Sequence, residues 1–402
     1  MSNKGLPVLP GQMLGILGGG QLGRMFVVAA RTMGYRIAVL DPDAASPAGR
    51  IADLHIRADY SDAAALAQLA GACAAITTEF ENVPAASLTT LAGLCRVTPA
   101  AEAVAIAQDR AREKSWLAEH GFATAPFARV ENEADLDAAL RQTGTPALLK
   151  VARLGYDGKG QARVTSLDDA RAAFREFGGV ACVLEGFVRL DREVSVVLTR
   201  NDMGETALFP VAENRHANGI LDVSLVPARI APELARDAHT KARAIADALG
   251  YIGVMAVEFF VVEGRLLVNE IAPRPHNSGH YTIDACVTNQ FEQQLRAVTG
   301  LPLGDPTQHT PAVMVNLLGD VWPGETESPD WTPVLRHPRA KLHLYGKRRA
   351  LPKRKMGHFT VLGDTVGRAL IDALAIKAEL VANRNAGSLP PPVSSLPPLT
   401  ER

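Results

Sequence analysis

The chain has 402 residues, of which 47% are hydrophobic and 21% are charged, so it is long enough for about two or three domains with buried cores. Its formal net charge of -1 argues against a general electrostatic attraction to nucleic acid or to an anionic membrane but does not exclude a local charged patch, and we expect neither as a partner. No apolar run approaches the roughly 18 residues of a membrane-spanning helix, and none resembles a signal peptide, so we expect a cytoplasmic protein. The four cysteines lie far apart, which predicts reduced thiols without disulfides or a zinc site.

The first hundred or so residues alternate between short apolar runs and amphipathic segments, as is typical of βαβ units. Such units form parallel sheets with helices on both faces, because their crossovers are nearly always right-handed. We therefore predict a doubly wound N-terminal domain over residues 1–112. Its predicted strands span 13–18, 35–41 and 74–80, and its predicted helices span 21–34 and 62–73.

A glycine-rich loop follows the first predicted strand and opens the first predicted helix. Gly18 to Gly23 read GGGQLG, which satisfies the dinucleotide-binding pattern G-x-G-x-x-G, and Asp41 ends the next strand where such sites keep an acid for the ribose. The pattern predicts either a dinucleotide site or a loop whose glycines only allow close packing of the helix on the sheet. Residues further along the chain must decide between the two.

The remainder of the chain has a mixed α+β pattern. Residues 113–308 contain predicted strands at 147–152, 161–166, 181–188 and 193–200 and predicted helices at 112–121, 168–178 and 232–250. A loop rich in proline and glycine near 302–311 marks a boundary, and strands at 341–346 and 357–364 predict a small C-terminal β domain over 309–384. Residues 385–402 include five prolines and are expected to be a disordered tail.

A second glycine-rich loop lies in LLKVARLGYDGKGQARV, between two predicted strands. Lys150 ends the first strand, and three glycines punctuate the loop before the chain returns. A flexible hairpin of this kind can close over a triphosphate, with Lys150 and Lys159 neutralising phosphate charge. The alternative is an exposed hairpin that carries charged residues.

Two acids occur in the predicted hairpin GVMAVEFFVVEGRLLVNEIAPRP. A three-residue loop over 263–265 would place Glu258 directly opposite Glu270, whereas a two-residue loop would place them on opposite faces. Two carboxylates about 4 Å apart repel by about 4 kcal/mol at an effective dielectric near 20, which a bound Mg²⁺ would offset. The alternative is a pair of solvated charges on an exposed strand.

These motifs together resemble the ATP-grasp enzymes, and among them the N5-carboxyaminoimidazole ribonucleotide synthetase family. The resemblance extends from about Leu14 to about Asp364 and depends on the order of several motifs in addition to GILGGGQLGRM and GYDGKGQ. They are TEFENVP at 78–84, EGFV at 185–188, ENRHANGI at 213–220, the pair Asn269-Glu270, and APRPHNSGHYT at 272–282.

The resemblance implies an ATP-grasp core and an activity. In the family, ATP phosphorylates bicarbonate to carboxyphosphate, and the amine of 5-aminoimidazole ribonucleotide then takes up the carboxyl group. ATP and Mg²⁺ or Mn²⁺ are the implied cofactors, the ribonucleotide and bicarbonate are the implied small-molecule partners, and a homodimer is the implied assembly. The alternatives are a formate-dependent glycinamide ribonucleotide transformylase of the same superfamily, or a nicotinamide-dependent oxidoreductase that uses the first glycine-rich loop.

Site residues follow from the resemblance position by position. Glu258 and Glu270 would hold the metal, Arg274 and His276 would contact bicarbonate or carboxyphosphate, and Tyr156 and Asp157 would order the substrate. From the residues alone, we would interpret Glu193 as a solvent-facing strand residue and His216 as a surface histidine. The residues implied to bind ATP are Arg110, Lys150, Gly155, Tyr156, Asp157, Gly158, Lys159, Gly160, Gln161, Glu185, Gly186, Phe187, Val188, Glu193, His216, Asn269 and Glu270. Those implied to bind the ribonucleotide are Gly20, Gln21, Leu22, Glu79, Lys347, Arg354 and Lys355.

The basic run KRRALPKRK, residues 347–355, resembles a nuclear-localisation or nucleic-acid patch. It lies between two predicted strands of a chain that is neutral overall. We therefore predict a turn that presents basic residues to one phosphate, and the resemblance implies that this phosphate belongs to the ribonucleotide and that Lys347, Arg354 and Lys355 bind it.

Overall fold

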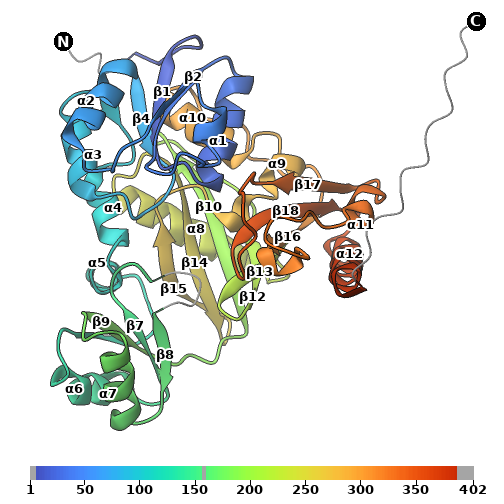
Figure 1. The fold of residues 1–402 in the computed structure, drawn as a ribbon. Coiled ribbons are helices and arrows are strands. Elements are labelled where there is room, and N and C mark those ends of the chain that lie inside the picture. The colour runs from blue at the N-terminus through green and yellow to red at the C-terminus, as the bar shows by residue number, and fades with distance from the viewer. Residues whose placement is uncertain (1–5, 156–159, 387–402) are drawn as a thin grey trace, which may run out of the picture.

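The computed structural model describes residues 6–155 and 160–386, which form three β-sheets with helices packed against them (Figure 1). Within these described ranges, no helix is long and apolar enough to cross a membrane. Residues 156–159 of the second glycine-rich loop lie outside the described residues, as do residues 387–402 of the predicted tail.

The N-terminal sheet is fully parallel with strand order β3-β2-β1-β4-β5, which confirms the doubly wound prediction. Its strands are β1 (Met13–Leu17), β2 (Arg36–Leu40), β3 (Leu54–Ile56), β4 (Ala75–Thr78) and β5 (Arg96–Val97). The sequence analysis missed β3, which is only three residues long. Helices α2 (Ala63–Ala72) and α3 (Ala85–Ala92) cover one face.

The other face of the N-terminal sheet is covered by α1 (Gln21–Thr32) and by α10 (Gln290–Thr299), which comes from much later in the chain. Phe291, Leu295 and Val298 of α10 are almost completely buried among side chains of α1 and β2. The first sheet thus completes its hydrophobic core with a helix that the sequence analysis did not assign to it.

A four-stranded antiparallel sheet forms a separate lobe, seen at the bottom of Figure 1. Its order is β6-β9-β7-β8, and α6 and α7 cover it. The sequence analysis missed β6 and α6. The bounds are β6 (Phe127–Val130), α6 (Asp135–Thr143), β7 (Ala147–Val151), β8 (Gln161–Val164), α7 (Leu167–Glu176) and β9 (Cys182–Gly186), preceded by α4 (Ala101–Ala107) and α5 (Arg110–Glu119).

The largest sheet has nine strands, with the path β15-β14-β10-β12-β13-β16-β18-β17 and β11 beside β10. The strands are β10 (Arg192–Arg200), β11 (Thr206–Leu208), β12 (Ala212–Ala217), β13 (Ile220–Val226), β14 (Gly253–Val262), β15 (Arg265–Ala272), β16 (Ala312–Leu318), β17 (Ala340–Leu344) and β18 (Lys355–Leu362). Short helical segments are η1 (Gly49–Ile51), η2 (Asn277–Gly279), α9 (Thr282–Ala285), η3 (Gly319–Val321) and α11 (Thr332–Leu335).

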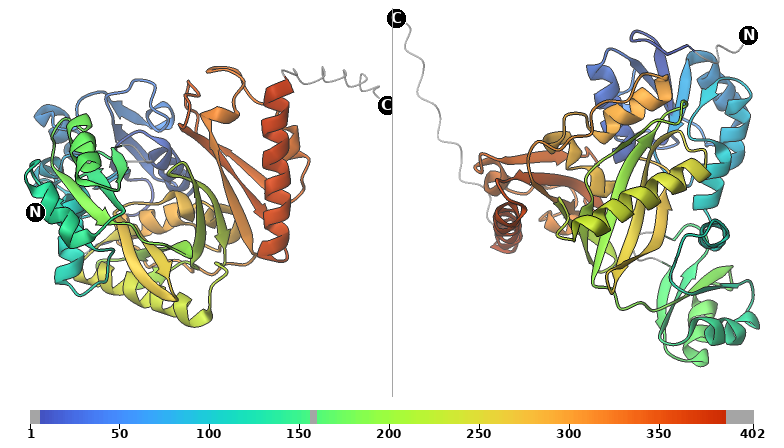
Figure 2. Two further views of the ribbon diagram at one scale, coloured as in Figure 1. Left: turned by 90° about the horizontal axis from the view of Figure 1, so that it is seen from below. Right: turned by 180° about the vertical axis from the view of Figure 1, so that it is seen from behind.

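The C-terminal strands continue the central sheet, because β16 pairs with β13. The predicted boundary at residue 309 therefore lies between two strands of one sheet, and the exact domain limits stay a prediction. Helix α12 (Val366–Ala386) packs on the C-terminal strands, as Figure 2 shows from two sides. The sequence analysis did not foresee this helix, and the predicted disorder is wrong for residues 385 and 386 because α12 includes them.

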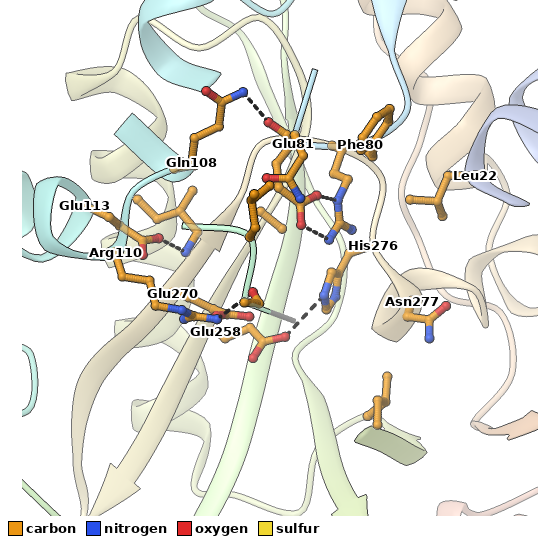
Figure 3. A pocket seen from close by; sticks show the side chains of 18 of the residues that line it. Leu22, Phe80, Glu81, Gln108, Arg110, Glu113, Glu258, Glu270, His276 and Asn277 are labelled. Atoms are coloured by element: carbon orange, nitrogen blue, oxygen red, sulfur yellow. Dashed lines mark hydrogen bonds and ion pairs between the residues drawn. The ribbon is translucent and has the colours of Figure 1, made fainter. Parts of the chain in front are cut away.

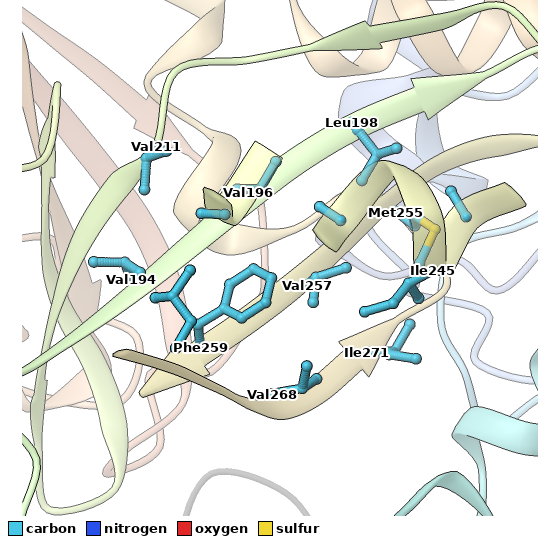
Figure 4. Close-up of a cluster of buried hydrophobic side chains, with 14 of the residues drawn as sticks. Val194, Val196, Leu198, Val211, Ile245, Met255, Val257, Phe259, Val268 and Ile271 are labelled. Carbon is cyan, nitrogen blue, oxygen red and sulfur yellow. The ribbon is translucent and has the colours of Figure 1, made fainter. Parts of the chain in front are cut away.

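Helix α8 (Pro232–Ala248) packs against β10, β14 and β15 (Figure 4). The hydrophobic core between the helix and these strands determines which strand side chains face away from α8. On β14, Met255, Val257 and Phe259 are buried toward α8. Because side chains alternate along a strand, Glu258 faces the opposite side of the sheet. That opposite side carries the candidate site.

Candidate active site

A cavity of about 390 Å³ lies where the N-terminal loops meet the large sheet (Figure 3). It brings together segments more than three hundred residues apart in sequence, from Gln21 to Lys355. Eleven of the residues predicted for the site line it, namely Gln21, Leu22, Glu79, Arg110, Gly155, His216, Glu258, Glu270, Arg274, His276 and Lys355.

A β-bulge places the two predicted metal ligands opposite each other. The turn between β14 and β15 has two residues, because Val262 pairs with Arg265, so the three-residue loop considered from the sequence is wrong. The pairing then shifts by one residue, and Glu258 pairs with Glu270 while Asn269 is the extra residue. The same shift turns Ile271, in place of Glu270, toward the α8 core.

The carboxylates of Glu258 and Glu270 have too little positive charge nearby to balance both of them. Arg110 donates to Glu270 at 2.9 Å and to the carbonyl oxygen of Gly155 at 3.3 Å. Burial raises the pKa of Glu270, but the charge of Arg110 outweighs it and the pKa lies below its ordinary value. Burial and the charge of Glu270 together raise the pKa of Glu258 to about 7. The pair therefore favours a bound cation.

Lys150 is not among the residues that line the cavity, and it is paired inside the protein. Its ammonium donates to Glu185 at 3.0 Å, and the buried Lys114 lies 3.5 Å from the same carboxylate oxygen. Burial raises the pKa of Glu185, but the two lysines overcome this effect and lower it to about 2. Glu185 therefore carries a charge throughout the physiological range and holds both lysines at the edge of the site.

Glu193 and His216 lie on the neighbouring strands β10 and β12, with His216 Nδ1 2.6 Å from a carboxylate oxygen of Glu193. Burial lowers the pKa of His216, but the bond to Glu193 outweighs it and the pKa lies above the ordinary value. The contact makes this pair part of the site region and argues against two unrelated surface residues.

His276 and Arg274 follow β15 and turn into the cavity. His276 Nε2 lies 3.2 Å from Glu258, and Arg274 forms a bidentate ion pair with Glu81. Burial and the charge of Arg274 lower the pKa of His276 well below its ordinary value, so the imidazole is neutral. The opposing effects of burial and of Arg274 leave the pKa of Glu81 at about 2.

The first glycine-rich loop binds carboxylates of its own chain. Gly20 and Gly23 donate their N–H groups to Glu79 at 2.5 and 2.7 Å, and Gly19 donates to Asp41 at 2.6 Å. A Cβ on Gly20 would lie 2.3 Å from the Glu79 carboxylate, so a side chain there would displace this carboxylate from the loop. Asp41 is buried and bound within this loop, which leaves it no role in holding a dinucleotide ribose.

The N–H groups of residues 21 and 22 open α1 and have no partner within the helix. Both residues line the cavity, so the positive end of α1 remains directed at it. Two backbone N–H groups of the loop therefore remain beside the cavity, next to the carboxylates of Glu79 and Asp41 that the loop binds.

The basic run forms the connection between β17 and β18, as predicted. Lys355 lines the cavity, and Lys347 donates its ammonium to the carbonyl oxygen of Lys355 at 2.7 Å. Arg354 is half-buried outside the cavity and donates to the carbonyl oxygen of Arg349. Lys355 is thus the member of the predicted trio that lines the cavity.

The other predicted nucleotide residues lie around the second glycine-rich loop and the four-stranded lobe. Gly160 has φ +68°, a value that favours glycine, and Gln161 begins β8. Phe187 is 47% exposed and lies under the guanidinium of Arg163 at 4.8 Å, just after Gly186 ends β9 and before Val188. The predicted residues Tyr156, Asp157, Gly158 and Lys159 lie outside the described residues.

The sequence analysis did not predict several residues that line the cavity. Glu113 lines it and accepts from the backbone N–H of Ile271, and burial with the charge of Glu270 raises the pKa of Glu113 to about 8. Gln108 donates to the carbonyl oxygen of Glu81 at 2.6 Å. Asn277 lines the cavity with its amide nitrogen and oxygen both buried and without a partner. Glu81 and Asn277 stand inside the motifs TEFENVP and APRPHNSGHYT, which was the available signal.

Comparison with known families assigns nearly the whole chain. A ribonucleotide synthetase preATP-grasp domain matches residues 12–108, and an ATP-grasp domain matches residues 115–291. A phosphoribosylaminoimidazole carboxylase C-terminal domain matches residues 312–371. The first match covers the parallel sheet, the second covers the four-stranded sheet and strands β10 to β15, and the third covers β16 to β18.

Individual relatives agree with these matches. The N5-carboxyaminoimidazole ribonucleotide synthase of Brucella melitensis is 48% identical over 87% of this chain and 96% of its own. A structure of the Staphylococcus aureus N5-carboxyaminoimidazole synthetase with ADP is 38% identical, with a TM-score of 0.86 over 92% of this chain and 98% of its own. The Aspergillus clavatus enzyme, solved with ADP and 5-aminoimidazole ribonucleotide, is 31% identical, with a TM-score of 0.83 over 93% of this chain and 99% of its own. The chain therefore belongs to the N5-carboxyaminoimidazole ribonucleotide synthase family of ATP-grasp ligases.

Proposed function

We propose that this protein uses ATP and bicarbonate to carboxylate the amine of 5-aminoimidazole ribonucleotide in purine biosynthesis. The observation that carries the proposal is the cavity itself. On one side it has the paired acids Glu258 and Glu270 with Arg110, and on the other the N-terminus of α1 with Lys355. A phosphoryl-transfer site and an anion site for a second substrate thus share one cavity.

Different residues along the cavity bind different parts of the substrates. Arg110, Lys150 and the second glycine-rich loop bind the phosphates of ATP, and the N-terminal loop binds the phosphate of the ribonucleotide. Arg274 and His276 also line the cavity, where they can hold bicarbonate and the carboxyphosphate formed from it. Electrostatic alignment of this kind is what phosphoryl transfer requires from a protein.

Glu258 and Glu270 suit Mg²⁺, which takes part of its ligands from phosphate and water, better than a metal ion whose ligands all come from the protein. In the described ranges 6–155 and 160–386, no group of three or more histidine, cysteine or acidic side chains is placed to hold a metal. Mg²⁺ prefers one or two carboxylates completed by phosphate oxygens and water, and Glu258 with Glu270 supply two. When bound with ATP, the ion neutralises charge on the transferred phosphoryl group.

The activity is tested by measuring phosphate release from ATP. We expect release to require Mg²⁺ and bicarbonate and to be strongly stimulated by 5-aminoimidazole ribonucleotide. Glycinamide ribonucleotide with formate is the control for the alternative ligase. Stimulation by that pair, or no effect of 5-aminoimidazole ribonucleotide, would overturn the substrate assignment.

The metal assignment is tested with Glu270→Gln. We expect kcat to fall about a hundredfold or more, because a charged metal ligand is lost where negative charge develops during the reaction. The fold should persist, as judged by circular dichroism. Glu263→Gln at the exposed tip of the same hairpin is the control and should retain parental activity. Near-parental turnover of Glu270→Gln would contradict the assignment.

We also propose a homodimer in the cytoplasm, on the basis of the family alone. Analytical ultracentrifugation at micromolar concentration should give twice the chain mass of 42.8 kDa. A monomer at every concentration would refute the dimer.

A further inference from the structure

A series of hydrogen bonds between buried polar side chains connects the nine-stranded sheet to His276. His276 Nδ1 lies 2.8 Å from Ser278 Oγ, which lies 2.8 Å from Ser195 Oγ. The Asn214 amide donates to Ser195 at 2.9 Å and accepts from Ser224 at 2.8 Å. None of the five residues is more than 9% exposed, so each hydrogen bond is shielded from water.

Two donors, the Ser278 backbone N–H at one end and the Asn214 amide at the other, give this series of hydrogen bonds a single direction. The backbone N–H of Ser278 donates to His276 Nδ1 at 3.3 Å, and an N–H can only donate, so Nδ1 is an unprotonated acceptor. Each hydroxyl has a single proton. The Ser278 hydroxyl therefore donates to Nδ1, the Ser195 hydroxyl donates to Ser278, and the Asn214 amide donates to Ser195.

The direction of these hydrogen bonds determines which ring nitrogen of His276 carries the proton that faces the cavity. If Nδ1 of a neutral imidazole is an acceptor, the proton is on Nε2, the nitrogen 3.2 Å from Glu258 (Figure 3). We propose that Ser278, Ser195 and Asn214 are positioning residues that hold His276 as its Nε2–H tautomer, so that it donates to anionic oxygens in the cavity and does not act as a base. The oxygen is that of Glu258 here and of bicarbonate or carboxyphosphate during turnover, the latter part resting on the proposed function.

The tautomer is tested by ¹⁵N NMR of the full-length protein labelled at histidine, with His276→Gln identifying the signals. We expect a protonated Nε2 and an unprotonated Nδ1. Asn214→Asp replaces the amide donor to Ser195 by an acceptor, so both hydroxyls should reverse and the Ser278 hydroxyl should no longer donate to Nδ1. The 3.3 Å bond from the Ser278 N–H to Nδ1 then remains as the opposing contact, so a mixture of Nδ1–H and Nε2–H tautomers is expected. Ser224→Ala is the control, because it leaves the Asn214 donor in place and should preserve the Nε2–H tautomer.

A second variant covers the case in which Asn214→Asp does not fold. Ser195→Ala removes the donor to Ser278 and should give a mixture of tautomers, whereas Ser195→Thr keeps the hydroxyl and should restore Nε2–H. A parental protein with the proton on Nδ1, or a folded Ser195→Ala variant with an unchanged tautomer, would overturn the proposal.

Kinetics separates positioning from a merely structural role. We expect Ser195→Ala to lower kcat about 10- to 100-fold with little change in KM for ATP, as is usual for groups that orient a residue beside a metal ligand. A variant that is less stable but has parental kcat and tautomer would refute the proposal. If the carboxylase activity itself is absent from the parent, only the proposed function fails, since the NMR result does not depend on turnover.

Discussion

At the scale of single residues, the site contains polar groups that the protein alone leaves unpaired. Asn277 is 6% exposed, yet neither its amide nitrogen nor its oxygen has a hydrogen-bond partner. A buried amide without partners lowers stability by about 1–3 kcal/mol. Such a cost is tolerable where a ligand supplies the partners, and Asn277 lines the cavity.

Replacing this amide by a hydrocarbon should separate stability from binding. We expect Asn277→Leu to raise the free energy of unfolding by about 1 kcal/mol or more, because an unpaired polar group is removed from the interior. KM for the ribonucleotide should rise at least about tenfold while KM for ATP is unchanged. Urea melts and steady-state kinetics provide the two measurements.

Asn201→Leu is the matched control. Asn201 is also fully buried, but its amide bonds to Glu205 and to two backbone N–H groups. That variant should lose stability and keep parental KM values. Equal behaviour of the two variants would contradict a ligand-binding role for Asn277.

Glu185 makes stability depend on pH. Its pKa of about 2 in the folded protein is below its ordinary value of 4.5, so its pairing stabilises the fold above about pH 4.5. This stabilisation is lost as the pH falls from about 4.5 to 2, where the carboxylate takes up a proton. Glu185→Gln should therefore be less stable than the parent at pH 7, by about 3–5 kcal/mol, and should depend less on pH below 4.5.

Unfolding by urea at several pH values checks this prediction. Glu176→Gln removes an exposed carboxylate from α7 of the same lobe and should follow the parental curve. Parallel pH curves for Glu185→Gln and the parent would show that the two lysines do not depend on this carboxylate.

At the scale of elements, the β14–β15 hairpin shows where sequence analysis stops. The strands and the acid pair could be predicted, because apolar alternation and the Glu263-Gly264 turn are local signals. The register could not, because the bulge at Asn269 is selected by packing of Val268 and Ile271 against α8. The short β3 and the helix α12 were missed for related reasons, since three residues give no period and α12 has weak amphipathicity.

Deleting Asn269 should turn the bulge into a regular ladder, because Val268 would stay opposite Phe259 and Glu270 would stay opposite Glu258. The stability of this variant should therefore be close to parental. Deleting Leu267 is the control of equal length, because it would place Asn269 opposite Phe259 in the α8 core, where an amide without partners costs about 1–3 kcal/mol. The melting temperatures of the two variants test this. Equal losses in the two variants would contradict the role of the bulge.

At the scale of the whole molecule, the cavity exists only because distant segments meet. Gln21 belongs to the N-terminal domain, Glu270 to the central sheet, and Lys355 to the C-terminal strands. The family motifs predicted most of these residues from sequence. The meeting of the segments was not predictable, because it depends on the pairing of β13 with β16 and on the packing of α10 against α1.

A ligand that contacts all of these segments should stabilise them together. At a hundred times its Kd, the ribonucleotide should raise the free energy of unfolding by about 2.7 kcal/mol. Hydrogen exchange should slow in both α1 and β18. The corresponding nucleoside, which lacks the phosphate, is the control and should protect neither. Protection confined to one segment would contradict a shared phosphate site.

The placement of α10 also sets an order for biosynthesis. The face of the first sheet that α1 shares with α10 stays open to solvent until residues 290–299 have left the ribosome. Synthesis at about 5–20 residues per second makes this wait on the order of ten seconds or more. A nascent chain released or stalled before that point exposes an apolar surface, so the first domain depends on the end of the second one for its solubility, and chaperones have a defined interval in which to act.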